Sequence, residues 1–196
     1  MSKAATFRRK ARGVLRLEDR TPLVGFVTSG DFRTRGLDTF LESAERIAQA
    51  RSDVRFLVVG SKRLPDWTAG HPLITGGRVH YRPKSSRPER WLAALDIFLY
   101  AARFEAFGMV ISEAQAMGIP VLTSRRVGAS ECLPIDYAPW LIDQPDSTEF
   151  AAKALMLLAD PDARRRLALA GLNHVTAFDQ HHYMRETVAT ILDQKR

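Results

Sequence analysis

The segment that most constrains the fold is residues 100–131, in which a strand end, a glycine turn, a helix and a second strand follow in close succession. The apolar run IFLY at residues 97–100 predicts a buried strand, and the run IPVLT at residues 119–123 predicts another. Between them a small-residue turn ends at Gly108, and a helix is expected from about Val110. This order is typical of a parallel sheet, because a parallel connection must cross over the sheet.

The rest of the chain repeats this alternation of short apolar runs and amphipathic segments. Further strands are expected at residues 23–28, 54–59 and 79–81. Helices are expected from Leu37, at residues 88–95, from Asp146, from Asp160 and at residues 180–194, with a loop at residues 61–77. Continuous apolar strands between helices indicate a sheet covered on both faces. We therefore predict one α/β, Rossmann-like domain over residues 21–196, preceded by a charged linker or lead-in over residues 1–20 with a short helix around residues 4–12.

Two turns of this predicted domain lie where open parallel sheets bind their ligands. The loop at residues 30–36 and the turn at residues 105–108 both follow strands, and ligands of such sheets sit outside the carboxyl ends of the strands. The helix that follows offers free backbone N–H groups and the positive end of its dipole to a diphosphate. Gly108, Met109 and Val110 are the candidates to present these N–H groups, and the glycine permits a close approach.

Two glutamates bracket this turn, Glu105 before it and Glu113 inside the helix, and carboxylates accept hydrogen bonds from sugar hydroxyls. Their spacing matches the E-x7-E motif of the retaining, GT-B-fold group 1 glycosyltransferases, and the words FEAFGMVISEA, AMGIPVLTS and VGASE also resemble that family. Upstream, SGDFRTRGLDTFL resembles the family's basic loop, with the lipopolysaccharide-core glucosyltransferases as the nearest likeness. The resemblance runs over residues 22–190. It implies the C-terminal, donor-binding half of a GT-B enzyme.

The resemblance implies that a basic pair in the first loop binds the donor diphosphate, where negative charge grows as the nucleotide leaves. The chain departs from the family here, because Arg35 stands where lysine is usual and Thr34 where the glucosyltransferases have arginine. Arg35 can still bind phosphate in bidentate fashion. Arg33 is the candidate to replace the missing partner. Arg35 is therefore assigned to catalysis and to substrate binding, and Arg33 to substrate binding.

The family likeness also assigns roles to the other candidates. Glu113 is expected to bind the ribose of the nucleotide. Glu105 is assigned to catalysis. It is expected to contact the hydroxyls of the transferred sugar, with stabilisation of a developing oxocarbenium ion as an open alternative. Lys84 and Ser85, in the RPKSS loop after a short strand, are the candidates for framing the nucleobase. Residues 127–131 match a loop that is expected to be structural.

A metal ion is not expected. The D-P-D word at residues 160–162 has the D-x-D spacing of metal-dependent transferases, but Asp followed by Pro is also typical of a helix N-cap. The five histidines show no HExxH or other ligand pattern. Arginines and a helix dipole can supply positive charge instead. We predict no metal and no cofactor, with a nucleotide sugar, by resemblance a UDP-sugar, as the substrate.

The net charge of +7 is compatible with nucleic acid, an anionic membrane or an anionic small ligand as a partner. The basic residues form separate clusters rather than an aromatic-studded stripe, and no helix-turn-helix or zinc spacing occurs, so nucleic acid is not expected. The single cysteine fits a reducing compartment. No run reaches the roughly 18 apolar residues of a membrane span. A cytoplasmic location is expected, with a basic face able to rest on the inner membrane surface.

These expectations combine into a function. The chain is expected to belong to a metal-independent, retaining hexosyltransferase that acts on a glycan or lipopolysaccharide-type acceptor. A GT-B enzyme needs an N-terminal acceptor domain, which this chain does not contain, so the chain alone is expected to bind a nucleotide sugar without transferring it. A non-catalytic sugar-nucleotide-binding module and a GT-B sugar-nucleotide epimerase are the alternatives, and a basic nucleic-acid-binding domain ranks last.

Overall fold

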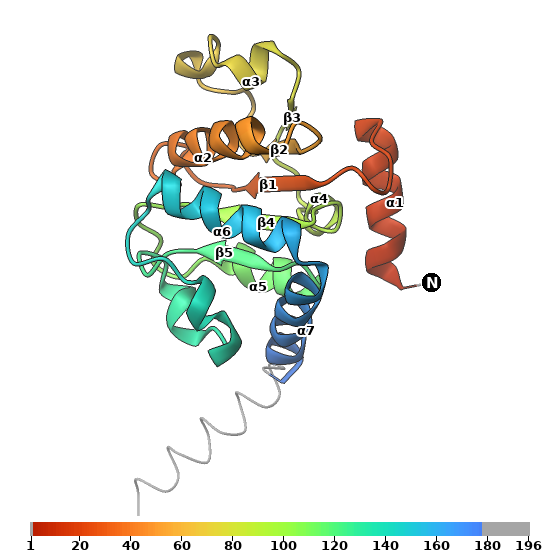
Figure 1. The fold of residues 1–196 in the computed structure, drawn as a ribbon, viewed down its shortest axis with the longest axis vertical. Coiled ribbons are helices and arrows are strands. Elements are labelled where there is room, and N and C mark those ends of the chain that lie inside the picture. Colours follow the sequence, from red (N-terminus) through yellow and green to blue (C-terminus); the bar gives the residue numbers. More distant parts are fainter. Residues whose placement is uncertain (1, 178–196) are drawn as a thin grey trace, which may run out of the picture.

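Five parallel strands lie side by side at the centre of the protein, in the order β3-β2-β1-β4-β5 (Figure 1). The computed structural model describes residues 2–177. The strands are β1 (Leu23–Val27), β2 (Arg55–Val59), β3 (Val79–Arg82), β4 (Ile97–Tyr100) and β5 (Val121–Thr123). The predicted α/β class and the parallel sheet are confirmed.

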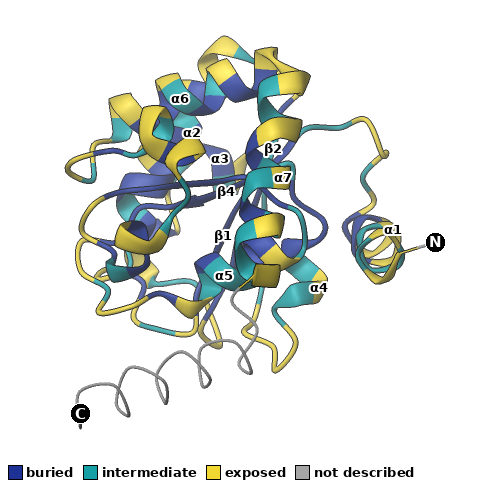
Figure 2. Ribbon diagram, turned by 90° about the horizontal axis from the view of Figure 1, so that it is seen from below, coloured by how far each residue is buried: buried dark blue, intermediate teal, exposed yellow. Residues whose placement is uncertain are grey.

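Helices cover both faces of the sheet, with α2 and α6 on one side of the strands and α4 and α5 on the other (Figure 2). The α-helices are α1 (Lys3–Leu15), α2 (Leu37–Ala50), α3 (Pro72–Thr75), α4 (Glu89–Leu92), α5 (Met109–Ala116), α6 (Ser147–Ala159) and α7 (Pro161–Ala177). The 3-10 helices are η1 (Asp66–Thr68), η2 (Gly128–Cys132) and η3 (Ile135–Trp140). Within residues 2–177, every helix is too short or too polar to cross a membrane.

The strands are buried because they are continuous apolar runs, and every residue of β1 and β4 is buried. The ring of Phe26 in β1 lies 5.5 Å from that of Phe40 in α2 and 6.1 Å from that of Tyr100 in β4, measured between centroids. Burying a side chain of this size contributes roughly 1.5–3 kcal/mol. This aromatic cluster therefore holds β1, β4 and α2 together directly below the ends of the strands.

Strand β1 is the point at which the winding of the chain reverses. It pairs with β2 on one side and with β4 on the other, so the crossover connections run in opposite directions from it. In such sheets a crevice opens at the carboxyl ends of the two strands that flank the reversal. The loops that leave these ends are residues 28–36 and 101–108, as the sequence predicted.

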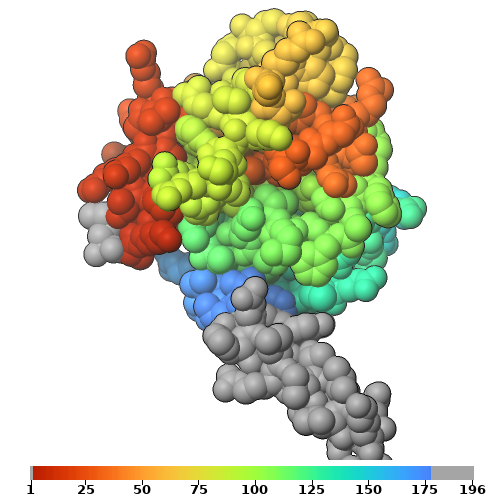
Figure 3. Space-filling model, turned by 180° about the vertical axis from the view of Figure 1, so that it is seen from behind, coloured from red at the N-terminus to blue at the C-terminus, as the bar shows by residue number. Residues whose placement is uncertain are grey.

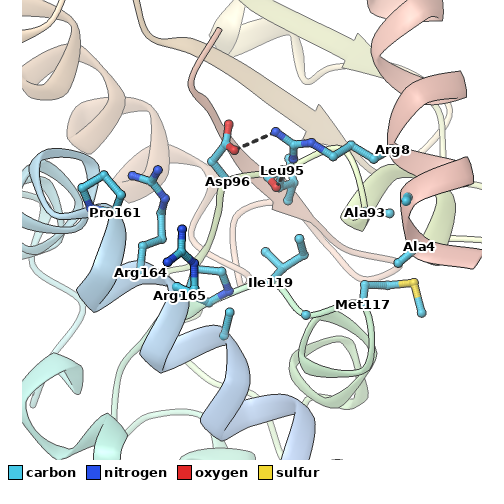
Figure 4. A pocket seen from close by; sticks show the side chains of 14 residues that line it. Ala4, Arg8, Ala93, Leu95, Asp96, Met117, Ile119, Pro161, Arg164 and Arg165 are labelled. Carbon is cyan, nitrogen blue, oxygen red and sulfur yellow. Dashed lines mark hydrogen bonds and ion pairs between the residues drawn. The ribbon is translucent and has the colours of Figure 1, made fainter. Parts of the chain in front are cut away.

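Helix α1 is longer than the short helix expected at residues 4–12, and it lies against α4. Figure 3 shows this red segment beside the yellow-green segment that contains α4. Two arginines bind it to the chain just before β4. Nη1 of Arg12 donates a 2.8 Å hydrogen bond to the carbonyl of Ala94, and Nη2 of Arg8 lies 2.8 Å from Oδ1 of Asp96 (Figure 4). A segment that reads as a charged lead-in is thus packed on the domain, and its role as an interdomain linker stays a prediction.

Other boundaries differ from the expectations. Residues 61–77 were expected to be a loop, but they contain η1 and α3, which are single turns too short to show a helical period. The helix expected at residues 88–95 is the single turn α4. Strand β5 begins after Pro120, which has no N–H to donate to a neighbouring strand. The helix expected at residues 180–194 lies outside the described residues.

Candidate functional site

A cleft of about 560 Å³ lies at the carboxyl ends of β1, β2 and β4. Its walls come from the loop after β1, the loop after β3 and the turn between β4 and α5. The lining residues are Val27, Thr28, Ser29, Gly30, Arg35, Val59, Lys84, Ser85, Pro88, Tyr100, Glu105, Ala106, Phe107, Gly108, Met109, Val110 and Glu113. Every site residue predicted from the sequence is among them except Arg33.

The N-terminus of α5 opens onto this cleft. Gly108, the N-cap residue, has φ +100°, a conformation that residues with a side chain rarely adopt. A glycine has no side chain that could cap the helix. Among the described residues, nothing accepts a hydrogen bond from the backbone N–H of Met109 or Val110. Two unsatisfied donors at the positive end of a helix dipole are suited to an anion such as a diphosphate.

Glu105 is held in the cleft through one of its two carboxylate oxygens. Oε2 accepts a 3.0 Å hydrogen bond from the hydroxyl of Tyr100 and lies 3.1 Å from Nε of Arg35. Within residues 2–177, Oε1 has no hydrogen-bond partner, so it is free to accept from a ligand hydroxyl. Burial raises the pKa of Tyr100, and the charge of Glu105 raises it further. Tyr100 therefore stays protonated and acts as a donor.

The backbone of Glu105 is fixed by the loop after β5. Its N–H donates to the carbonyl of Arg126 (3.2 Å), and its own carbonyl accepts from the N–H of Gly128 (3.0 Å). A parallel bridge between Glu105 and Val127 results. Gly128 must lack a side chain, because a Cβ there would lie 2.1 Å from the carbonyl oxygen of Ala106. Val127 and Gly128 thus hold the backbone of Glu105 in place, and the structural role expected for the rest of residues 127–131 stays a prediction.

Arg35 reaches the cleft, but most of its guanidinium is already engaged. Nε faces Glu105, and Nη1 donates to the carbonyl of Phe104. Nη2 is left as the donor for a phosphate oxygen. The arginine therefore connects the carboxylate of Glu105 to the part of the cleft lined by the N-terminus of α5.

Glu113 lies on α5 with its side chain half-buried in the cleft wall. Burial raises its pKa, and the nearby charge of Glu89 raises it further. Lys84 and Ser85 line the same cleft from the loop after β3. That loop is held because the N–H of Lys84 donates to the carbonyl of Ser61 (3.0 Å). The three residues predicted for the nucleoside thus come together, and their ligands stay predictions.

Arg33 is not brought to the cleft. Residues 31–36 form a helical turn in which the N–H of Arg35 donates to the carbonyl of Asp31 (3.0 Å). Positions two apart in such a turn point in different directions. The guanidinium of Arg33 lies instead over the ring of Trp67, 5.5 Å from its centroid. The expectation that Arg33 replaces a missing phosphate ligand beside Arg35 is therefore not met by this geometry.

No motif of the sequence assigns a role to three residues that shape the site. Tyr100, the last residue of β4, positions Glu105. A hydroxyl at the carboxyl end of an apolar strand is the sequence feature that could have indicated this role. Asp38 and Arg103 clamp the first loop onto the second. Arg103 binds Asp38 in bidentate fashion at 2.7 and 2.8 Å, and it also donates to the carbonyl of Arg33 (2.8 Å). The clamp joins residues 65 positions apart, so no local pattern indicates it.

The D-x-D word at residues 160–162 is a helix cap. Oδ1 of Asp160 accepts hydrogen bonds from the N–H groups of Asp162 (2.9 Å) and Ala163 (2.8 Å), which confirms the capping interpretation. No three His, Cys, Asp or Glu side chains within residues 2–177 are grouped so that they could hold a metal ion.

A second hollow, of about 360 Å³, lies at the opposite ends of the strands, between α1 and α7 (Figure 4). Three arginines line it, but each has protein partners. Arg8 binds Asp96, Arg164 donates to the carbonyl of Leu157 (2.9 Å), and Arg165 pairs with Asp162. Arg8 and Arg164 are thus engaged by the domain itself, whereas the exposed pair of Arg165 and Asp162 is weak. None of the site residues predicted from the sequence lines this hollow, so the cleft at the carboxyl ends is the better candidate.

Comparison with protein families matches residues 21–160 to the family described as "Glycosyl transferases group 1". One curated relative is the GDP-mannose-dependent monoacylated alpha-(1-6)-phosphatidylinositol monomannoside mannosyltransferase of Corynebacterium glutamicum. It is 29% identical over 94% of this chain and 50% of the relative. Another is the lipopolysaccharide core biosynthesis glycosyltransferase LpsE of Rhizobium meliloti, 31% identical over 60% of this chain and 35% of the relative. The chain spans half or less of the length of these relatives.

Solved structures share the fold. The C-terminal domain of LpcC, a glycosyl transferase group 1 family protein from Francisella tularensis, superimposes with a TM-score of 0.74 at 21% identity, over 91% of this chain and 98% of that one. HepE of Anabaena, solved in complex with UDP-glucose, gives a TM-score of 0.77 at 20% identity, over 99% of this chain and 54% of that one. At these identities the likeness establishes the architecture alone.

Proposed function

The chain belongs to the group 1 glycosyl transferases, and from this premise we propose that it is the donor-binding part of a retaining hexosyltransferase. The donor is a nucleotide sugar, with UDP as the preferred nucleotide. HepE, which shares the fold, was solved with UDP-glucose. The mannosyltransferase relative is named for GDP-mannose, so the base has to be tested.

The observation that carries this proposal is the arrangement around Glu105. Its free Oε1 is a hydrogen-bond acceptor for a sugar hydroxyl. The same cleft offers the unsatisfied N–H groups of Met109 and Val110 together with Nη2 of Arg35. A nucleotide sugar has hydroxyls next to a diphosphate, and the cleft has an acceptor next to anion-binding donors.

These groups can also favour the transfer step. As the bond between the sugar and the diphosphate breaks, negative charge grows on the leaving phosphate oxygens. The helix N-terminus and Arg35 are already in place to stabilise that charge, so neither has to reorganise during the reaction. We propose that they do this without a metal ion, and that Glu105 holds the hydroxyls of the sugar as it departs.

The remaining parts of the enzyme are proposals about a longer protein. An acceptor-binding domain would close over the exposed rim formed by Phe104, Phe107 and Met109, which are 65%, 48% and 63% exposed. The LpsE relative is named for lipopolysaccharide core biosynthesis. A glycan or glycolipid acceptor is therefore proposed, with the enzyme in the cytoplasm and in peripheral contact with the membrane.

The test is calorimetric titration of the chain with UDP, GDP, UDP-glucose and GDP-mannose, without added metal. We expect saturable binding of one nucleotide and its sugar. Glu105→Gln should weaken binding of the nucleotide sugar about tenfold or more and that of the free nucleotide less, because this carboxylate reaches the nucleotide only through Arg35. Glu131→Gln, an exposed glutamate of the loop after β5, is the control. Equal weakening of nucleotide and nucleotide sugar by Glu105→Gln would contradict the assignment.

A further inference from the structure

A separate hollow of about 360 Å³ borders the cleft on the β2 side. It lies between the loop after β1 and the loop after β2, both at the carboxyl end of the sheet. Its lining residues are Gly30, Asp31, Phe32, Arg33, Ser61, Arg63, Leu64, Pro65 and Trp67. We call it the Trp67 hollow. Gly30 lines both this hollow and the cleft, so the two lie next to each other.

The Trp67 hollow combines an aromatic face with a guanidinium fork. The indole of Trp67 is 43% exposed, and the guanidinium of Arg33 lies over its ring. Among residues 2–177, no atom accepts a hydrogen bond from this guanidinium. An arginine stacked on an aromatic ring keeps its N–H edges free, and these edges match the two oxygens of a carboxylate or phosphate.

Asp31 and Arg63 bring the other charges to the hollow. Oδ1 of Asp31 accepts from the N–H (2.8 Å) and the hydroxyl (3.0 Å) of Thr34, and the negative charge of Asp31 also acts on Arg33. Arg63 adds a second guanidinium. Its partner is Asp66, 3.6 Å away, and both side chains are more than four-fifths exposed. An exposed pair of this kind is weak and can rearrange around a ligand.

The position of the hollow indicates which substrate it serves. Gly30 lies against Arg35, since a Cβ on the glycine would be 2.8 Å from Nε of that arginine. Arg35 in turn contacts Glu105. The hollow therefore opens beside the end of the cleft where the transferred sugar is proposed to sit, and a molecule that receives this sugar would pass over it.

We propose that the Trp67 hollow binds an anionic group, a phosphate or a carboxylate, carried on the saccharide acceptor. Arg33 would hold the oxyanion, and the exposed part of Trp67 would pack on the sugar ring. This inference rests on the proposed function, because it assumes that a sugar is transferred at the cleft. It assigns to Arg33 a role in acceptor specificity in place of donor binding.

The test uses the indole N–H signals of the full chain in NMR spectra, since the chain has three tryptophans and Trp67→Phe identifies the relevant signal. The chain, first saturated with UDP, is titrated with glucose, glucose 6-phosphate, glucuronate and inorganic phosphate. We expect the two anionic sugars to shift the Trp67 signal at millimolar concentration and glucose to leave it in place. Inorganic phosphate should bind at least several-fold more weakly than glucose 6-phosphate.

Variants separate a built site from general charge attraction. Arg33→Gln should weaken the response to both anionic sugars about tenfold, and Arg63→Gln should weaken it less. Arg166→Gln, an exposed arginine on α7, should change nothing. An unchanged response in Arg33→Gln, with its other signals at native positions, would overturn the proposal. So would inorganic phosphate binding as tightly as the sugar phosphate, or no shift with either anionic sugar.

The donor proposal is read from different signals in the same spectra. UDP should shift the backbone amides of Met109 and Val110, which lie outside the Trp67 hollow. If these amides do not respond to UDP, the proposal that the cleft binds the donor is wrong, whether or not the Trp67 signal shifts. If they respond and Trp67 does not, only the acceptor inference fails.

Discussion

The hydroxyl of Tyr100 donates a 3.0 Å hydrogen bond to Oε2 of Glu105, the same oxygen that faces Nε of Arg35. Both restraints fall on one carboxylate oxygen, and the other is left open to the cleft. The tyrosine ring is part of the aromatic core with Phe26, so the core of the domain orients the carboxylate directly.

Removing this hydroxyl should loosen Glu105 without removing it. We expect Tyr100→Phe to weaken nucleotide-sugar binding about tenfold and to leave free UDP binding unchanged, with a loss of about 1–2 kcal/mol in the free energy of unfolding. Calorimetry and urea denaturation measure the two effects. Tyr81→Phe is the matched control, because its hydroxyl donates to the carbonyl of Gly60 (3.1 Å) away from Glu105. Equal losses in the two variants would refute the positioning role.

Glu113 should affect stability and binding in opposite directions. Its folded pKa is raised, so the ionised carboxylate costs stability, and this cost grows as the pH rises through the folded pKa. Glu113→Gln should therefore raise the melting temperature at pH 7. It should also weaken binding of UDP and of UDP-glucose by about 10- to 100-fold, because two hydroxyls of a ribose would lose a charged acceptor. A variant that lowers both quantities would show that the glutamate serves mainly the scaffold.

Gly108 should be intolerant of any side chain. Gly108→Ala places a Cβ 2.8 Å from Cγ1 of Val127 at φ +100°, and we expect a loss of about 1–3 kcal/mol in unfolding free energy. Nucleotide binding should also fall, since the turn carries the N–H groups of α5. Gly77→Ala is a close control, because φ is +67° there and nothing lies within 4 Å of the added Cβ. Unfolding curves and UDP titrations of both variants would reveal a loss of binding confined to Gly108.

The clamp between Asp38 and Arg103 should make stability depend on pH. Burial of Asp38 opposes its ionisation, but the hydrogen bonds from Arg103, the N–H of Thr39 and the charge of Arg103 together outweigh burial and lower the pKa below the usual 3.8. The ionised clamp therefore contributes stability above about pH 4, and this contribution is lost as the pH falls through the folded pKa. Asp38→Asn should be about 1 kcal/mol less stable than wild type at pH 7.

The difference in unfolding free energy between wild type and Asp38→Asn should shrink toward pH 3, because wild type also loses the charge of Asp38 there. Urea denaturation at both pH values measures it. The same difference should be smaller in an Arg103→Gln background, where the N–H of Thr39 still stabilises the charged carboxylate. A gap that stays constant from pH 7 to pH 3 would contradict the clamp.

Much of the fold could be predicted from local sequence. The strands are apolar runs flanked by turn residues, and the parallel order follows from their alternation with helices. The cleft could be located because Gly108 and Arg35 both follow strands that end at the same edge of the sheet. Within a single turn of helix the same reasoning fails. Arg33 and Arg35 look like a pair in the sequence, but a helical turn points them into two different hollows.

The periodicity, the element order and the residue types at the turn from Glu105 to Glu113 can therefore be read along the chain, because they depend on neighbouring residues. Folding in three dimensions is needed to bring Tyr100 and Arg35 onto one oxygen of Glu105, Arg103 onto Asp38, and Arg12 against the carbonyl of Ala94. Such contacts join distant segments, and each depends on how two loops or a loop and a helix pack. Packing of this kind is set by the whole core, so no local pattern encodes it.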